Sequence, residues 1–121
     1  MREKIKALGL FVAASIGVKE DGMKRADLLS DAGVDILTID IAHGDSVMMF
    51  ETLAYVKKKF PEIDVIAGNT ATPEGVRRLI EHGADSVKVD IVPLTAVAMC
   101  VLEAQKHNIP VIADGGIKTS G

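Results

Sequence analysis

The sequence predicts an α/β protein with a parallel sheet, because short apolar runs of strand length alternate with helix-like stretches along the chain. One segment also occurs twice: residues 32–40 and residues 82–90 share a glycine, an aspartate and a final aspartate at the same spacing. In each copy a helix is expected to end at the glycine, and a short apolar run follows it. A second pair, residues 63–68 and 109–114, repeats in the same order. Recurring strands that end in polar or glycine residues are typical of parallel α/β proteins, which bind ligands at the carboxyl ends of their strands.

The composition agrees with one domain of this class. A chain of 121 residues suits one domain, and about two thirds of the surface of the unfolded chain can be buried at this size. Apolar residues make up 48% of the sequence and aromatic residues only 3%. A core of Val, Ile, Leu and Ala follows, as parallel sheets covered by helices require.

Charge and cysteine content argue against several classes of function. The net charge of -3 leaves no basic surface for nucleic acid, and the basic run from Lys57 to Lys59 is expected near a helix end, where the dipole stabilises cations. The single cysteine excludes an internal disulfide and a multi-cysteine metal site. We see neither a signal peptide nor an apolar run of about 18 residues, so we expect a soluble cytoplasmic protein with no membrane partner.

The first elements follow from glycine positions and helical periodicity. Residues 1–8 are expected to be the last turns of a helix that Gly9 ends, and residues 10–16 form the first strand. After a turn at residues 17–21, a helix over residues 22–32 places its apolar positions on one face. Those positions are Met23, Ala26, Leu28, Leu29 and Ala32.

Capping residues mark the next helix. The second strand covers residues 35–39, and a loop follows it. Asp45 or Ser46 is the expected N-cap of a helix over residues 47–60, because the side chain of either residue can accept a bond from a free backbone amide. Pro61 stops this helix.

The rest of the chain repeats the pattern. The third strand, residues 64–67, is expected to end at the Gly-Asn pair after it, and Thr72 caps a helix over residues 73–82 that begins with proline. Residues 86–89 form the fourth strand. A helix over residues 95–107 and a fifth strand over residues 111–113 complete a βαβαβαβαβ order, which requires right-handed parallel crossovers.

Four short motifs, in their order and spacing, resemble the IMP dehydrogenase and GMP reductase family. They are Asp40-Ile41-Ala42-His43-Gly44, Ala67-Gly68-Asn69, the segment from Gly83 to Val89, and the segment from Ile112 to Ile117. Enzymes of that family are TIM barrels. The resemblance covers residues 9–121 and implies βα units of such a barrel, strands three to seven of eight, in a single partial catalytic domain over residues 1–121. A free-standing half-barrel or a flavodoxin-like sheet is the alternative.

The resemblance also implies which residues bind a nicotinamide cofactor, NAD or NADP. Asp40 ends a buried strand, so its carboxylate is expected at the mouth of the barrel, where it can accept bonds from ribose hydroxyls. By resemblance, Asp40 and Ala42 lie on the cofactor side, and Asn69 lies beside the reacting base. His43 falls in a loop near the cofactor, but a loop histidine is more often a capping or surface group than a base.

The substrate side is implied by the last motif and the fourth strand. Asp114 offers a carboxylate for ribose hydroxyls, and Gly115 and Gly116 offer bare amides for phosphate oxygens. By resemblance these residues hold a purine nucleoside monophosphate. Lys88 is the remaining candidate. It binds the substrate, or it is the buried partner of Asp40 or Asp114.

The sequence departs from the family after the fourth strand. Members carry a long glycine-rich loop there, with the catalytic cysteine and the glycines that bind a monovalent cation, whereas here residues 90–91 join Val92 and Pro93 directly. We therefore assign no catalytic residue and no metal ligand. Cys100 lies in the middle of a helix among apolar residues, as a core thiol does, and cannot replace the missing nucleophile.

Three explanations of this absence stay open. The chain is part of a longer enzyme from which the loop has been left out, or a natural or engineered fragment that folds alone, or a binding module that has lost the chemistry. We favour the first, because the gap coincides with a loop that must move in such enzymes. It predicts a step between consecutive Cα atoms, somewhere from Asp90 to Pro93, that exceeds the about 3.8 Å of a peptide bond.

The resemblance implies a purine nucleotide oxidoreductase. In the dehydrogenase direction a cysteine thiolate adds to C2 of IMP, hydride passes to NAD, and water releases XMP. The alternatives are GMP reductase, which converts GMP to IMP with NADPH, and a non-catalytic phosphate-binding module like a receiver domain, in which Asp40 and Asp90 would pair. We favour the dehydrogenase, expect the 121-residue chain itself to be inactive, and expect a homo-oligomer, a tetramer by resemblance.

Overall fold

The computed structural model describes residues 7–90 and 93–115. Within them, five parallel strands form one sheet. The strands are β1 (Ala13–Ile16), β2 (Ile36–Asp40), β3 (Asp64–Thr70), β4 (Ser86–Val89) and β5 (Val111–Ala113). The helices between them are α2 (Lys19–Ala32), α3 (Val47–Lys59), α4 (Pro73–Glu81) and α5 (Leu94–Gln105). The predicted alternation of strands and helices is confirmed.

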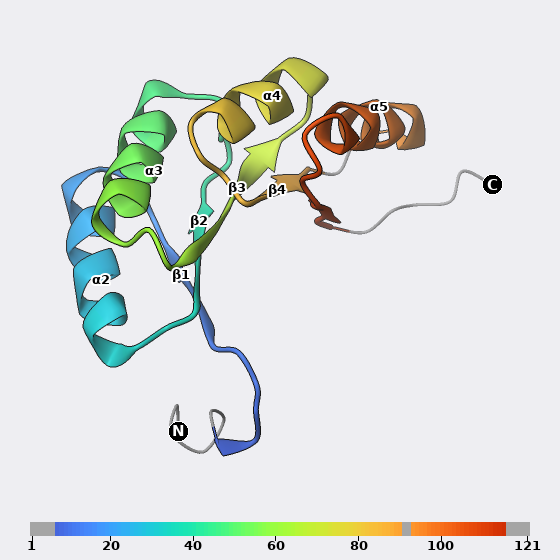
Figure 1. Cartoon of the computed structure of the whole chain (residues 1–121). Coiled ribbons are helices and arrows are strands. Elements are labelled where there is room, and N and C mark those ends of the chain that lie inside the picture. Colours follow the sequence, from blue (N-terminus) through green and yellow to red (C-terminus); the bar gives the residue numbers. More distant parts are fainter. Residues whose placement is uncertain (1–6, 91–92, 116–121) are drawn as a thin grey trace.

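The strands are neighbours in chain order, from β1 to β5. Each crossover therefore moves one strand further in the same direction, and the helices lie together on the outer side of a curved sheet (Figure 1). A flavodoxin-like sheet would have the order 2-1-3-4-5 with helices on both faces, so that alternative is wrong. The fold is an open set of βα units, as in part of a TIM barrel, and its sheet is not closed among the described residues.

Side chains alternate between the two faces of each central strand, and the helices cover one of these faces. Six strand residues on the covered face are completely buried: Leu37, Ile39, Val65, Ala67, Val87 and Val89. The helices contribute buried side chains from their inner sides, among them Leu53, Val56 and Leu79. Residues between these positions, such as Thr38, Ile66 and Lys88, therefore belong to the concave face, where the interior of a closed barrel would be.

The repeated segment has a structural role in both copies. Gly33 and Gly83 have φ of 86° and 107°, a left-handed conformation that glycine adopts without strain, and each follows the end of a helix. The aspartate two residues later binds the start of a neighbouring strand. The Asp35 carboxylate accepts from Val12 N at 2.8 Å, and the Asp85 carboxylate accepts from Val65 N at 2.8 Å.

Three predicted boundaries are wrong by three residues each, and the others by no more than two. β1 begins at Ala13, not at residue 10, because Val12 N donates to a carboxylate and not to a neighbouring strand. α2 begins at Lys19, not at residue 22, and the Lys19 amide donates to Thr52 Oγ1 at 3.1 Å. β3 continues past the predicted Gly-Asn end to Thr70. The first predicted helix lies mostly at residues 1–6, outside the described residues.

Predicted caps are confirmed, whereas one predicted apolar face is only partly buried. Ser46 and Thr72 accept from the amides of Met49 and Gly75 at 3.3 and 3.1 Å, as N-caps. In α2, however, Leu28 is 71% exposed. The helix buries its small residues at the contact with the sheet instead.

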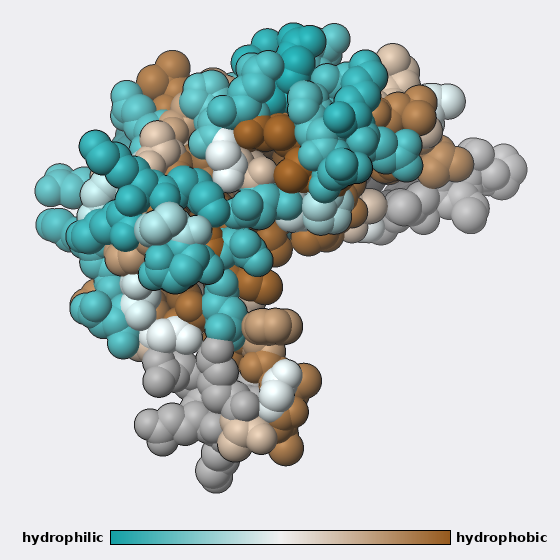
Figure 2. Space-filling model, in the orientation of Figure 1, coloured by the Kyte–Doolittle hydropathy of each residue, from teal (hydrophilic) through white to brown (hydrophobic). Residues whose placement is uncertain are grey.

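Hydrophobic residues gather on the concave side of the molecule, whereas the helical surface is mostly hydrophilic (Figure 2). Exposed large apolar side chains include Leu10, Phe11 and Ile112. None of the described helices is long and apolar enough to cross a membrane.

Candidate functional site

Four polar side chains meet at the carboxyl end of the sheet, each from a different strand or the residue after it. Lys88 Nζ lies 3.2 Å from Asp40 Oδ1 and 3.0 Å from Asp114 Oδ2. Asn69 Nδ2 donates to the same Asp114 oxygen at 3.2 Å. We call Asp40, Asn69, Lys88 and Asp114 the Lys88 cluster. The Lys88 ammonium group links β2, β4 and the end of β5, and Asn69 on β3 joins the cluster through Asp114.

The cluster depends on a glycine in the strand between its members. Asp40 is in register with Gly68, and the sheet order places β3 between β2 and β4. Lys88 must therefore pass the backbone of Gly68 to reach Asp40. A Cβ atom at Gly68 would lie 2.5 Å from Lys88 Cβ and 2.8 Å from Lys88 O, so the bare backbone at this position is needed for the close approach. The peptide bond between Gly68 and Asn69 is cis.

Contacts within the cluster stabilise the charged forms of Lys88 and Asp114. Burial of the Lys88 amine, whose side chain is 14% exposed, favours its neutral form, but hydrogen bonds to Asp114 and Asp40 outweigh this and raise the pKa of Lys88. Hydrogen bonds from Lys88 and Asn69 hold the pKa of Asp114 below its usual value. Both Asp114 and Lys88 are therefore charged at neutral pH. The two carboxylates are about half exposed, so they present acceptors to a ligand with hydroxyl groups.

A cavity of about 320 Å³ lies beside the cluster, between the loops that follow β2 and β3. Asn69 belongs to both the cavity and the cluster. The loop after β2 is held there by backbone bonds: Gly44 N donates to Asn69 O at 2.7 Å, and Ile41 N donates to Gly68 O at 2.9 Å. The cavity is lined by Ala42, His43, Gly44, Asp45, Asn69, Thr70, Ala71, Thr72 and Asp90.

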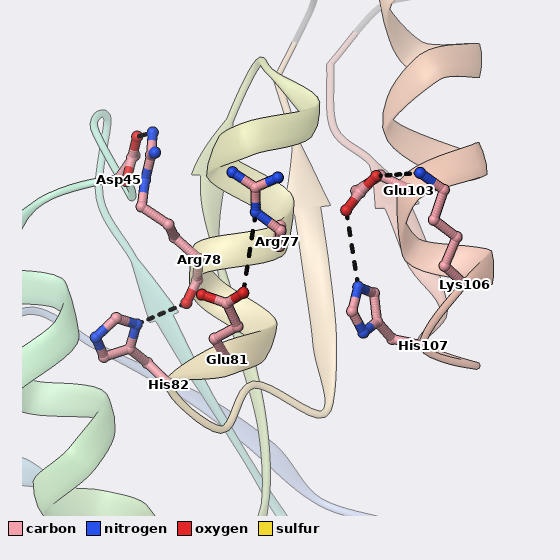
Figure 3. Close-up of polar contacts among 8 residues, drawn as sticks. All are labelled: Asp45, Arg77, Arg78, Glu81, His82, Glu103, Lys106 and His107. Carbon is pink, nitrogen blue, oxygen red and sulfur yellow. Dashed lines mark hydrogen bonds and ion pairs between the residues drawn. The ribbon is translucent and has the colours of Figure 1, made fainter.

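One ion pair at this cavity has no local signal in the sequence. Arg78, on α4, reaches across to Asp45 in the loop after β2, and its Nε donates to Asp45 Oδ1 at 2.7 Å (Figure 3). Hydrogen bonding to Arg78 lowers the pKa of Asp45. The pair tethers the loop to the helix and so keeps one wall of the cavity in place.

Other ion pairs in the same region lie on the helix surface. Figure 3 shows Arg77 with Glu81 on α4, and Glu103 with Lys106 and His107 at the end of α5. These pairs join residues three or four positions apart in the sequence, which is the usual arrangement of surface pairs on helices. They support the helices and do not reach the cluster.

The structure brings together most residues that the sequence predicted as a site. The cluster unites two predicted cofactor residues, Asp40 and Asn69, with two predicted substrate residues, Lys88 and Asp114. Lys88 is the ion partner of both carboxylates, which was one of its two predicted roles. Because parallel strands end at the same side of a sheet, residues far apart in the sequence meet there.

The other predicted positions lie around this cluster. Ala42 and His43 line the cavity. Gly115 follows Asp114 with φ of 100°, and Gly116 lies outside the described residues. The long step predicted between Asp90 and Pro93 falls on residues 91 and 92, which also lie outside them.

Cys100 is fully buried in α5, and burial raises the pKa of its thiol. It is the single cysteine of the sequence. A thiol that is both buried and kept protonated is a poor nucleophile, which agrees with its prediction as a core residue.

Fold and site together define the class of protein: an α/β protein built from the consecutive βα units of a partial TIM barrel, with charged and amide side chains gathered at the carboxyl end of its strands. Comparison with known families then narrows this class. The family model described as "IMP dehydrogenase / GMP reductase domain" matches residues 2–121. The chain belongs to the IMP dehydrogenase / GMP reductase family.

Curated relatives agree with this assignment. Proteins named inosine-5'-monophosphate dehydrogenase from Chlorobaculum tepidum, Staphylococcus aureus and Aquifex aeolicus are 46%, 45% and 44% identical to this chain over 128 residues. Each alignment covers 93% of this chain and 26% of the relative, so the chain spans about a quarter of the length of these relatives.

Proposed function

We propose that the Lys88 cluster binds the ribose groups of a purine nucleoside monophosphate and of a nicotinamide cofactor, as part of an enzyme that oxidises IMP to XMP with NAD. The observation that supports this proposal is the contact of Lys88 with both Asp40 and Asp114, which joins the predicted cofactor side and the predicted substrate side in one cluster. The names of the relatives favour the dehydrogenase over GMP reductase.

The chemistry of the cluster fits ribose hydroxyls. Asp40 and Asp114 are accessible carboxylates, and carboxylates accept hydrogen bonds from paired hydroxyl groups. NAD would be held by Asp40, with Ala42 and Asn69 at the wall of the adjacent cavity, and would supply the hydride acceptor. The monophosphate would be held by Asp114, with the backbone after it near the phosphate. The residues of this chain then bind and orient both ligands.

The chemical step requires a thiolate that this chain does not offer at the strand ends. Its single cysteine is buried in α5, away from solvent. We therefore expect the 121-residue chain to bind nucleotides without turning them over. Steady-state assays with IMP plus NAD, and with GMP plus NADPH, test this directly. Turnover that disappears in Cys100→Ala would contradict our assignment of Cys100.

Isothermal titration calorimetry tests the binding site itself. We expect the purified chain to bind IMP and to bind NAD, with Asp114→Ala weakening IMP about tenfold or more, because hydrogen bonds to a charged group are worth about 1.5 to 3 kcal/mol. Asp64→Ala is the matched control, since Asp64 is an exposed aspartate at the opposite end of β3. Equal loss of affinity in both variants, or no binding of either ligand, would refute the proposal.

A further inference from the structure

Lys88 spans an unusual distance within the sheet. Neighbouring strands lie about 4.8 Å apart, so β2 and β4 are about twice that distance apart. The Lys88 side chain nevertheless contacts Asp40 on β2, over the bare backbone of Gly68, and also contacts Asp114 beyond β5. One ammonium group, with its three N–H donors, thus connects two carboxylates on opposite sides of its own strand.

From this geometry we propose that Lys88 is a positioning residue that couples the two halves of the site. It aligns Asp40 and Asp114 before either ligand binds, so that occupancy of one half changes the affinity of the other. This inference rests on the proposed function for the identity of the ligands. The positioning itself rests on the contacts alone.

Repulsion between the carboxylates gives the alignment its physical reason. Asp40 Oδ1 and Asp114 Oδ2 lie 3.2 and 3.0 Å from the same nitrogen, so the two oxygens are close enough for like charges to repel. Lys88 offsets this repulsion and fixes one oxygen of each carboxylate. Asn69, from β3, adds a second donor to the fixed oxygen of Asp114.

Coupling follows because the two carboxylates share one partner. When a ligand hydroxyl draws Asp114 away from Lys88, the ammonium group can bond more strongly to Asp40. In the same way, a ligand at Asp40 strengthens the bond between Lys88 and Asp114. A change of hydrogen bonding at one end of the cluster therefore alters the acceptor strength at the other end. Two binding sites linked in this way must affect each other reciprocally.

The positioning role can be tested without any ligand. Carbon-detected NMR follows the titration of the Asp114 carboxyl in the wild-type chain and in Lys88→Met, whose side chain is unbranched and one atom shorter but carries no charge. We expect the titration midpoint of Asp114 to rise by about one pH unit or more in Lys88→Met, and to return close to the wild-type value in Lys88→Arg. An unchanged midpoint in Lys88→Met would overturn the proposal.

Two further variants keep this test decisive. Lys57→Met is the matched control, because Lys57 pairs with Asp85 at 2.8 Å, and we expect it to leave the Asp114 titration unchanged. If Lys88→Met does not fold, Asp40→Asn gives the same information with Lys88 in place. The midpoint of Asp114 should then fall below the wild-type value, because Lys88 no longer serves a second carboxylate, and no shift would again overturn the proposal.

The coupling is measured with IMP and NAD as probes. We expect saturating IMP to change the dissociation constant of NAD at least about fivefold in the wild-type chain, with this factor falling towards one in Lys88→Met and recovering in Lys88→Arg. If both ligands bind, but IMP changes the dissociation constant of NAD by the same factor in wild type and in Lys88→Met, the coupling is refuted and the proposed function stands. Failure of the wild-type chain to bind either ligand would refute the proposed function, and the Asp114 titration would still decide the positioning role.

Discussion

Gly68→Ala is the substitution that the geometry of the cluster makes most informative. The added Cβ would lie 2.5 Å from Lys88 Cβ, 2.8 Å from Lys88 O and 3.1 Å from Lys88 Cα. Carbon atoms in good contact lie about 3.5 to 4 Å apart, so strands β3 and β4 must separate locally. Two of the three clashing atoms belong to the backbone of β4, and a rotamer change alone cannot relieve them.

The expected cost follows from overpacking. Extra methyl groups in a well-packed region destabilise by about 1 to 3 kcal/mol, and two backbone clashes favour the upper part of this range. Alanine also lowers the conformational entropy of the unfolded chain, but this stabilising effect offsets only about 0.4 to 1 kcal/mol of the cost. We expect Gly68→Ala to lower the free energy of unfolding by about 2 kcal/mol, and also to displace Lys88 from Asp40.

Urea denaturation followed by circular dichroism measures the first effect, and the Asp114 titration measures the second. Gly17→Ala is the matched control, because a Cβ at Gly17 meets no atom within 4 Å and the residue does not have a positive φ. We expect its stability to stay within about 0.5 kcal/mol of wild type. If both alanine variants were equally stable, the close approach of Lys88 to Gly68 would be incorrect.

Three further predictions concern a cap, the carboxylates and the thiol. Thr72→Ala should lower the free energy of unfolding by about 1 kcal/mol in urea denaturation, because it removes the acceptor for Gly75 N, and an unchanged midpoint would contradict the cap. The folded pKa values of Asp114 and Asp45 lie below 3.8 because of their cationic hydrogen-bond partners, so their contribution to stability is complete above pH 3.8 and is lost as the pH falls through those lower values. Unfolding in urea at a series of pH values should show this loss, with a smaller slope in Asp45→Asn. Cys100 should react with a thiol reagent at pH 8 only slowly until denaturant is added, and rapid reaction in the folded protein would refute its burial.

The elements were largely predictable from local signals. Strands appeared as apolar runs, and several helix ends were marked by a capping residue, a glycine or a proline, because these signals act within a few residues. The boundary of β3 shows where local signals fail. The Gly68-Asn69 pair predicts a strand end, yet the strand continues to Thr70. The glycine is there because a lysine from another strand passes over it, which is a tertiary contact without a local signal.

Most residues of the site could be predicted from the sequence, but the contacts between them could not. Polar residues at the ends of parallel strands must meet at one end of the sheet, so Asp40, Asn69 and Asp114 could be grouped from the sequence. The spacing did not show that Lys88 serves both carboxylates. Nor did it show Arg78, which lies 33 positions from Asp45 and faces it only after α4 has packed against the sheet.

The central claim is that a purine nucleotide binds at the carboxyl end of this sheet, against the Lys88 cluster. The most direct measurement is a titration of the ¹⁵N-labelled chain with IMP, followed by the amide shifts of the assigned protein. We predict that the largest shifts occur at Asn69, Lys88 and Asp114, and that the amides of Asp64 and Asp85, at the amino end of the same strands, stay unchanged. Saturable shifts centred on the amino end, with the cluster unaffected, would contradict the account.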